Sequence, residues 1–343
     1  MKAILYEQSN VSEIEYPSEI GDIMADCYTA ISPGKDTEIT IPKGLGHLFE
    51  YVEQGVHINL DKKYIELDLP EITVDTDKVI VGYSSGVDST SQALYQRSIG
   101  KNVILFHVKH LNNSYPDEYD SAVRFAKDFG FPIVVIEPKF IKQKVYIDNP
   151  IKNQTILAYM IDYGRTIGCM NYAMGNYRSD ALKEQVEGYE TTDAVELFDS
   201  FNDYIHGLFS QYVYYDMPFD KYGAFEFVVN NEPRALPYIN SCMRPYRFKD
   251  YTHDITSRKY NIPLIPHHCG VCFKCALEYL ILADLKYYPI DRAYGKKCIS
   301  SLRENEGTTY TLHLDKSMSD KRVLERVLER DVVPARWNIV LRK

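Results

Sequence analysis

The sequence predicts an α/β protein built on a parallel β-sheet, and three observations support this class. Residues 79–81 are all β-branched, which is typical of a strand that is buried on both faces. Small residues and then a helix-like pattern follow this run directly. Strand-like and helix-like segments then alternate as far as residue 174. Repeated βα units of this kind imply a parallel sheet with helices on both faces.

The individual elements are predicted from their periodicities, two residues for a strand and 3.6 for a helix. Strands are expected at 79–83, 103–108, 132–137 and 170–174, and helices at 88–98, 118–129 and 153–166. Ligands of such sheets bind beyond the carboxyl ends of the strands. We therefore expect the loop 84–89, Phe106-His107 and Gly175 to lie at one edge of the sheet.

The regions on either side of this core have different patterns. Residues 1–76 predict a separate, small β-rich domain without a catalytic motif, because turn-forming residues separate short β-like runs at 2–6, 37–41, 56–60 and 64–69. The main domain is predicted over 77–300. Within it, the acidic and aromatic segment 176–240 loses the alternation and is predicted to be an insertion over the ligand edge. Residues 301–343 form a tail with a charged helical run and a short final strand at 337–341.

Composition restricts the class of protein. The chain has 343 residues, of which 45% are hydrophobic and 25% are charged, as in an ordinary globular protein. No stretch approaches the roughly 20 apolar residues of a membrane helix, and the first residues do not resemble a signal peptide. We therefore expect a cytoplasmic protein without a membrane partner. A net charge of −9 argues against a long nucleic-acid surface.

The loop that follows the strand at 79–83 is the strongest motif. Its residues are Tyr83, Ser84, Ser85, Gly86, Val87, Asp88, Ser89 and Thr90. A strand, a turn of small residues and a helix N-terminus together form an anion site, because free backbone N–H groups and the helix dipole point at the turn. No Gly-Lys-Ser/Thr follows, so this is not a Walker motif. An ordinary βα turn capped by Asp or Ser is the alternative.

A group of cysteines is the second motif. Cys269, Cys272 and Cys275 have the spacing Cys-x2-Cys-x2-Cys and lead into a helix-like segment. Three thiolates at this spacing predict a structural Zn²⁺ site, which needs a fourth ligand. Cys242 is the first candidate for that ligand, and His267 and His268 are alternatives. An iron–sulfur cluster is the alternative to zinc.

The other three cysteines, Cys27, Cys169 and Cys298, have no ligand-like spacing, and we interpret them as plain thiols.

The loop resembles the Ser-Gly-Gly-x-Asp-Ser signature of the PP-loop ATP pyrophosphatases, which cleave ATP between its α- and β-phosphates. Ser85 stands where that family usually has its first glycine. Together with the cysteine group, the loop is similar to the 7-cyano-7-deazaguanine synthase (QueC) family, over roughly 79–285. The resemblance implies a fold like that of the adenine nucleotide α-hydrolases, with a metal site of four cysteines between 242 and 275.

Weaker matches suggest further site residues. Phe106-His107 corresponds to the family's Phe-His and would border adenine, although a buried histidine at a strand end is the alternative. Asn153 and Gly175 resemble other nucleotide-binding positions, and Asp180 would contact the deazapurine. Lys221 would be an extra cation on the phosphates, with a solvated lysine as its alternative.

The resemblance implies a reaction. ATP would activate the carboxylate of 7-carboxy-7-deazaguanine, with Asp88 holding Mg²⁺ and Ser84, Ser89 and backbone N–H groups contacting the departing pyrophosphate. An amine would then displace AMP. Ammonia would give the amide and, after a second activation, the nitrile.

Four other possibilities stay open. A protein amine or N-terminus is an alternative acceptor, as in a QueC-like protein of an anti-phage system. A PP-loop enzyme that modifies tRNA or DNA is another, and a non-catalytic nucleotide-binding module is a third. The sequence also leaves a homodimer open.

Overall fold

The structure is a computed structural model. It describes residues 1–31, 37–70, 72–75, 77–109, 118–138, 151–175, 195–219, 221–240, 278, 281–282 and 285, and the backbone of 310–314 and 337–341. For residues 55–56 and 195–197, too, only the backbone is described. The chain divides into two compact units. The first comprises Met1–Tyr83, Tyr95–Leu111 and Ala126–Met217, and the second comprises Ser84–Leu94, Asn112–Phe125 and Pro218–Lys343.

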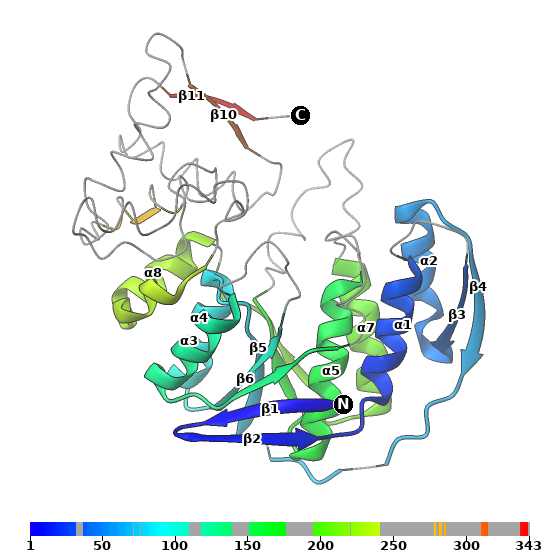
Figure 1. Cartoon of the computed structure of the whole chain (residues 1–343). Coiled ribbons are helices and arrows are strands. Elements are labelled where there is room, and N and C mark those ends of the chain that lie inside the picture. The colour runs from blue at the N-terminus through cyan, green and yellow to red at the C-terminus, as the bar shows by residue number, and fades with distance from the viewer. Residues whose placement is uncertain are drawn as a thin grey trace. The chain divides into compact units, whose positions relative to one another are not determined.

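A seven-stranded sheet forms the centre of the first unit, in the order β2-β1-β7-β6-β5-β8-β9 (Figure 1). Its strands are β1 (Lys2–Glu7), β2 (Asn10–Glu15), β5 (Lys78–Gly82), β6 (Asn102–Val108), β7 (Ile133–Ile136), β8 (Asn171–Ala173) and β9 (Val213–Tyr215). The strands from β7 to β9 pair in parallel, and β1 and β2 continue the sheet in antiparallel pairing. The predicted α/β class with a mostly parallel sheet is confirmed.

The predicted core elements are also confirmed, within one residue at each end. Strands β5 to β8 correspond to the four expected strands, and the helices are α3 (Val87–Ser98), α4 (Glu118–Phe129) and α5 (Lys152–Thr166). The residues of β5 that suggested a buried strand, 79–81, have no exposed surface. Burial on both faces explains their continuous apolar run.

Residues 1–76 differ from the expected separate β-rich domain. Here β1 pairs with β7, so this region contributes to the central sheet. The region also contains two helices, α1 (Glu19–Ile31) and α2 (Gly46–Val56). In α1 the buried residues Ile20, Met24 and Ile31 recur at helical spacing. Strand pairing with β1 covers the edge that β7 would otherwise leave open.

A small parallel pair, β3 (Thr37–Pro42) and β4 (Leu60–Ile65), completes this region. The helix α2 and the short 3-10 helix η1 (Lys43–Leu45) connect the two strands. The strand predicted at 56–60 is wrong, because α2 continues to Val56 and His57 then ends it in a left-handed conformation, with φ of 53°. Only the first two residues of the strand predicted at 64–69 belong to β4.

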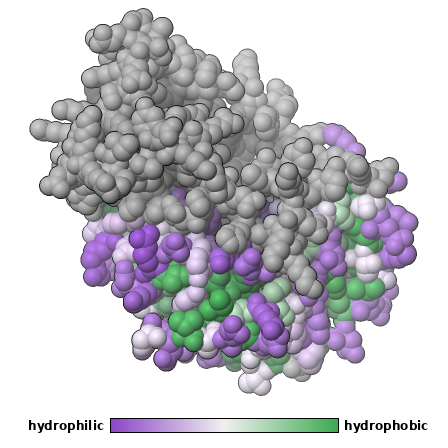
Figure 2. Space-filling model, viewed as in Figure 1, coloured by the Kyte–Doolittle hydropathy of each residue, from purple (hydrophilic) through white to green (hydrophobic). Residues whose placement is uncertain are grey.

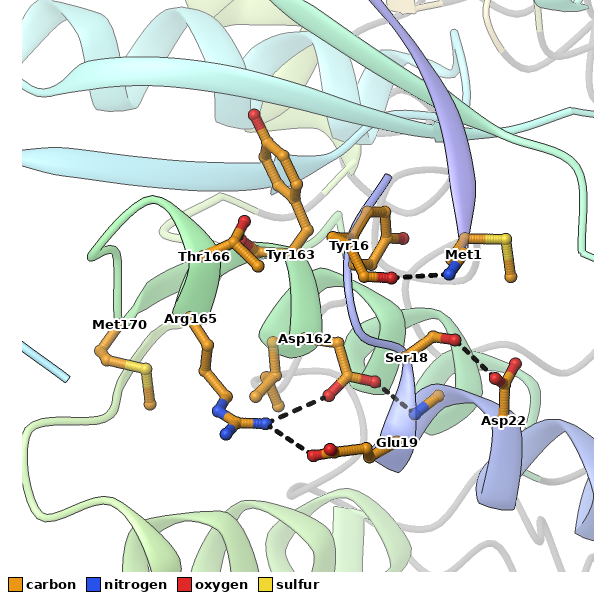
Figure 3. A network of polar contacts seen from close by, with 12 residues as sticks. Met1, Tyr16, Ser18, Glu19, Asp22, Asp162, Tyr163, Arg165, Thr166 and Met170 are labelled. Atoms are coloured by element: carbon orange, nitrogen blue, oxygen red, sulfur yellow. Dashed lines mark hydrogen bonds and ion pairs between the residues drawn. The ribbon is translucent and has the colours of Figure 1, made fainter. Parts of the chain in front are cut away.

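A buried polar network joins α1 to α5 (Figure 3). Asp162 on α5 is fully buried, and its Oδ2 accepts a hydrogen bond of 2.7 Å from the backbone N–H of Gly21. The Nη1 of Arg165 lies 3.3 Å from Glu19 Oε2 and 3.8 Å from Asp162 Oδ1. Glu19 therefore competes for the guanidinium, and the cation compensates Asp162 only in part.

Burial is the main influence on the ionisation of Asp162. It raises the pKa of this carboxyl to about 7, although the N–H of Gly21 and the charge of Arg165 act in the opposite direction. We infer that desolvation outweighs the ion pair, since the Arg165 contact is long and shared. Tyr16 lies nearby, and burial together with Asp162 and Asp22 raises the pKa of its hydroxyl well above its ordinary value.

The same two helices approach each other closely at Gly21. A Cβ atom at this position would lie 2.3 Å from the ring of Tyr159, which is a prohibitive overlap. The Tyr159 hydroxyl donates a hydrogen bond of 2.9 Å to Asp22 Oδ1, one residue further along α1. The absence of a side chain at Gly21 thus allows the ring of Tyr159 to pack against the backbone of α1.

The second unit contains α8 (Lys221–Asn231), the 3-10 helix η3 (Pro233–Tyr238) and the parallel pair β10 (Tyr310–Leu314) and β11 (Trp337–Leu341). The strand predicted at 337–341 is confirmed by β11. The charged helical run predicted in the tail lies outside the described residues. The ring of Tyr238 packs edge-on against Phe125 of α4, with ring centroids 5.9 Å apart.

The described surface is mostly hydrophilic in the view of Figure 2, with an apolar area where β1 and β2 lie in Figure 1. Val11 of β2 is the most exposed large apolar side chain described, at 64%. Among the described residues, no helix combines the length and the apolarity that a membrane crossing requires.

Candidate functional site

The candidate site is the loop between β5 and α3. Strand β5 ends at Gly82, the segment 83–86 follows, and α3 begins at Val87. The N–H of Thr90 donates to the Gly86 carbonyl over 3.0 Å, which is the first bond of the helix. The backbone N–H groups that precede Thr90 have no acceptor within the helix, and the positive end of its dipole lies at the loop. The predicted strand–turn–helix arrangement is therefore present.

Ser85 has a left-handed backbone, with φ of 58°. This conformation costs an L-residue other than glycine roughly 1–2 kcal/mol. Ser85 is also fully buried, and its Oγ donates a hydrogen bond of 3.1 Å to the carbonyl of Glu118. Its own carbonyl accepts a hydrogen bond of 2.6 Å from the N–H of Asn240. Two such bonds, each contributing about 0.5–1.5 kcal/mol, offset a strain of that size.

Ser89 stabilises the loop from within. Its Oγ accepts a hydrogen bond of 3.2 Å from the backbone N–H of Ser84 and lies 3.3 Å from Ser84 Oγ. The same hydroxyl donates to the Gly86 carbonyl over 3.2 Å. Ser89 is the third residue of α3, so its hydroxyl reaches back from the first helical turn and closes the loop. The described hydrogen bonds of Ser89 thus go to residues of the loop itself, and its contact with pyrophosphate stays a prediction.

Exposure divides the predicted loop residues into two sets. Ser84 is exposed, and Gly86 and Asp88 are half-buried, so these three can meet a ligand. A Cβ at Gly86 would be 3.5 Å from Ser84 Oγ, an ordinary contact that leaves the loop open here. The other five residues are buried, namely Tyr83, Ser85, Val87, Ser89 and Thr90. The outward set therefore offers one hydroxyl, one uncovered stretch of backbone and one carboxylate.

The ends of β5 and β6 meet inside the first unit. The N–H of Tyr83 donates to the Phe106 carbonyl over 2.8 Å, and His107 Nδ1 lies 2.8 Å from the Tyr83 carbonyl. Since a carbonyl only accepts, Nδ1 of His107 carries the proton. Tyr83, Phe106 and His107 are all at most 3% exposed, and the Phe106 ring packs near Tyr163. His107 is thus a buried strand-end histidine, and an adenine contact stays a prediction.

The remaining predicted residues are spread along the chain. Asn153 is the second residue of α5, and Gly175 lies two residues beyond the end of β8, so both belong to the first unit. Lys221 begins α8 in the second unit. Asp180 and the predicted zinc ligands Cys242, Cys269, Cys272 and Cys275 lie outside the described residues.

Two of the cysteines without ligand-like spacing are described. Cys27 and Cys169 are buried and unoxidised. Burial raises the pKa of the Cys27 thiol to about 12 and that of Cys169 to about 11, so neither is a thiolate at neutral pH. Both fit their interpretation as plain thiols. Within the described part of the chain, no group of His, Cys, Asp or Glu side chains is placed to share a metal ion.

A cleft that the sequence did not predict lies in the first unit. It has a volume of about 360 Å³ and lies within the segment predicted as an insertion. Helix α7 (Val195–Leu208) and the region of β9 form its walls, with the lining residues Asp199, Asn202, Asp203, His206, Tyr212 and Tyr214. The four lining residues on α7 are spaced three and four apart, which places them on one helix face. This spacing is the only feature of the sequence that could have indicated the cleft.

Comparison with models of protein families and with curated proteins finds no match for this chain.

Proposed function

We propose that this protein is an AMP-forming enzyme that activates a carboxylate with ATP and transfers the acyl group to an amine. The observation that carries the proposal is the left-handed turn at Ser85 directly before the N-terminus of α3. A left-handed residue next to right-handed ones turns successive N–H groups toward one point, which is an anion-binding arrangement. The resemblance of this loop to the PP-loop signature supports ATP as the source of the anion.

The outward residues of the loop fit the phosphates of ATP. Gly86 leaves the backbone uncovered, so phosphate oxygens could approach the N–H groups of the first turn of α3. Ser84 is exposed, and its hydroxyl, which lies 3.3 Å from Ser89 Oγ, would turn from that contact to donate to a phosphate. In the reaction these donors would stabilise the charge that develops on pyrophosphate as it leaves.

Asp88 is the residue that would hold Mg²⁺. Its carboxylate lies in the first turn of α3 and is half-exposed, and carboxylate oxygens together with phosphate oxygens are the ligands that Mg²⁺ uses in nucleotide sites. The ion would neutralise the charge of the phosphates. The predicted Zn²⁺ site is structural in this proposal, because four protein ligands leave no position for a reacting group.

The reaction balances as two substitutions. A carboxylate oxygen attacks the α-phosphorus of ATP, the bond to the β-phosphate oxygen breaks, and pyrophosphate leaves. The amine nitrogen then attacks the acyl carbon, AMP leaves with the bonding electron pair, and the ammonium loses a proton. We propose 7-carboxy-7-deazaguanine as the acid, on the resemblance to the QueC family, and ammonia or a protein amine as the acceptor.

The proposal is tested by mass spectrometry of the products after incubation with Mg-ATP, 7-carboxy-7-deazaguanine and ammonium. AMP together with the amide or nitrile would support it. AMP without either product would support the activation step and direct the search to a protein amine. If no AMP forms with either kind of acceptor, the proposal is wrong.

Replacing Asp88 by Ala should lower the rate of AMP formation by at least about 100-fold, since the loss of one electrostatic contact to a charged transition state typically slows a reaction by that factor. The fold should survive, because Asp88 is a half-exposed residue of the first helical turn. Circular dichroism would check the fold. Asp68→Asn, at an exposed position of the first unit, is the matched control and should keep full activity. Unchanged AMP formation by Asp88→Ala would assign the metal to other ligands.

A further inference from the structure

We propose that Ser85 is a positioning residue, which locks the anion-binding turn through its side chain and does not itself contact the anion. This inference rests on the proposed function, because it concerns the same loop. It assigns to Ser85 a role different from that of the neighbouring Ser84, whose hydroxyl is exposed.

The first argument is the direction of the Ser85 side chain. Ser85 has no exposed surface, and its Oγ donates to the Glu118 carbonyl over 3.1 Å. A hydroxyl has a single proton to donate, so this proton is not available to a phosphate. The side chain is therefore directed into the protein, while the backbone of the same residue shapes the loop.

The second argument is that Ser85 is held on two sides. Its Oγ donates to the carbonyl of the first residue of α4, and its own carbonyl accepts from the N–H of Asn240, two residues beyond η3. Both partners belong to the same compact unit as the loop. A serine without these bonds would relax from the left-handed region, because that region is strained for any residue with a Cβ.

The third argument is that a glycine would reach this conformation without help but would not be held in it. Glycine adopts positive φ freely, and it also adopts many other conformations. The serine hydrogen bond selects one conformation before the ligand arrives. A turn fixed in advance binds more tightly, since less conformational freedom is lost on binding.

The test compares three variants of the full chain by calorimetric titration with magnesium pyrophosphate. Ser85→Ala removes the hydroxyl but keeps the strain, and should weaken binding by about tenfold. Ser85→Gly removes both the hydroxyl and the strain, and should weaken it by no more than about threefold. Ser91→Ala is the matched control, since the Ser91 hydroxyl is also buried and also donates to a carbonyl, that of Asp88, but lies inside α3.

A purely structural role would lower the melting temperature of Ser85→Ala without a change in pyrophosphate affinity, and that result would overturn the inference. Equal weakening by Ser91→Ala would overturn it too. If the wild type binds pyrophosphate and Ser85→Ala does so more weakly than Ser85→Gly, the inference stands even when no AMP is formed from the deazaguanine acid. If the wild type binds no pyrophosphate, both the inference and the proposed function fail.

Discussion

Among single residues, Asp162 is a fully buried carboxyl that has only a long, shared contact with a cation. A buried carboxyl is normally either ionised and well paired or protonated. Asp162 lies between these cases, since it accepts the Gly21 N–H but shares Arg165 with Glu19 (Figure 3). Burial raises its pKa to about 7, so near neutral pH it is divided between its charged and neutral forms.

The raised pKa predicts how stability depends on pH. Between the ordinary value of 3.8 and about 7, the folded protein keeps a proton that the unfolded chain has lost. The contribution of Asp162 to the free energy of unfolding is thus complete at low pH and falls as the pH rises to about 7, by up to about 4 kcal/mol.

Asp162→Asn should remove this dependence, because an amide does not titrate and can still accept the Gly21 N–H. Urea unfolding between pH 4 and 8 would measure it, as the difference in stability between the wild type and the variant. As the pH rises, the wild type should lose stability relative to the variant, and the difference in the free energy of unfolding should become constant above pH 7. A constant difference would mean that Asp162 titrates normally.

The sequence predicted the position of the candidate site but not the orientation of its individual residues. The loop 83–90 was predictable because small residues after a buried strand are a local signal. The division into inward and outward residues was not, since it depends on partners such as Glu118 and Asn240, which come from distant parts of the chain. Ser85 departs from the PP-loop pattern, yet it adopts the backbone conformation that glycine favours.

At the scale of elements, the contact between α1 and α5 depends on one missing side chain. Gly21→Ala would place a methyl group 2.3 Å from the Tyr159 ring. The helices would have to separate or the ring would have to leave its site, and such overpacking typically costs about 1–3 kcal/mol. This exceeds the roughly 1 kcal/mol that alanine gains over glycine inside a helix. We therefore expect a net loss of stability.

Gly207→Ala is the matched control for that substitution. Gly207 lies in α7, and a Cβ there would meet nothing within 4 Å. The same change should thus leave stability unaltered or raise it by up to about 1 kcal/mol. Thermal unfolding of both variants would test the pair. If both changed stability by the same amount, close packing at Gly21 would not be the cause.

The elements from β5 to α5 were predictable because strands of four to seven mostly apolar residues alternate with helices of 12 to 15 residues. The region 1–76 was harder for a physical reason. The segment 56–60 alternates apolar and polar residues as a strand does, but it has only five residues, and the first of them belongs to the end of α2. The pairing of β1 with β7 is a contact between distant segments, so no local pattern could reveal it.

At the scale of the whole molecule, the cysteine group predicts a dependence of folding on metal. Cys272→Ser should lose bound zinc and lower the melting temperature together, because structural zinc binding contributes directly to the free energy of folding. Elemental analysis and thermal unfolding of the purified chain would measure both.

Cys298→Ser is the control, since Cys298 has no ligand-like spacing, and this variant should keep its metal. Retention of the metal by Cys272→Ser would remove Cys272 from the ligand set. Iron in place of zinc would favour the cluster alternative and an enzyme that modifies nucleic acid.

The pairing of β1 with β7 also has a consequence for protein synthesis. Ala3 pairs with Ile136, so the hairpin of β1 and β2 leaves the ribosome long before its partner strand has been made. At about 5–20 residues per second, the delay is on the order of ten seconds. During this time the apolar side chains of the hairpin lack their final neighbours. The nascent chain therefore presents this hairpin to chaperones and to aggregation until β7 emerges and pairs with β1.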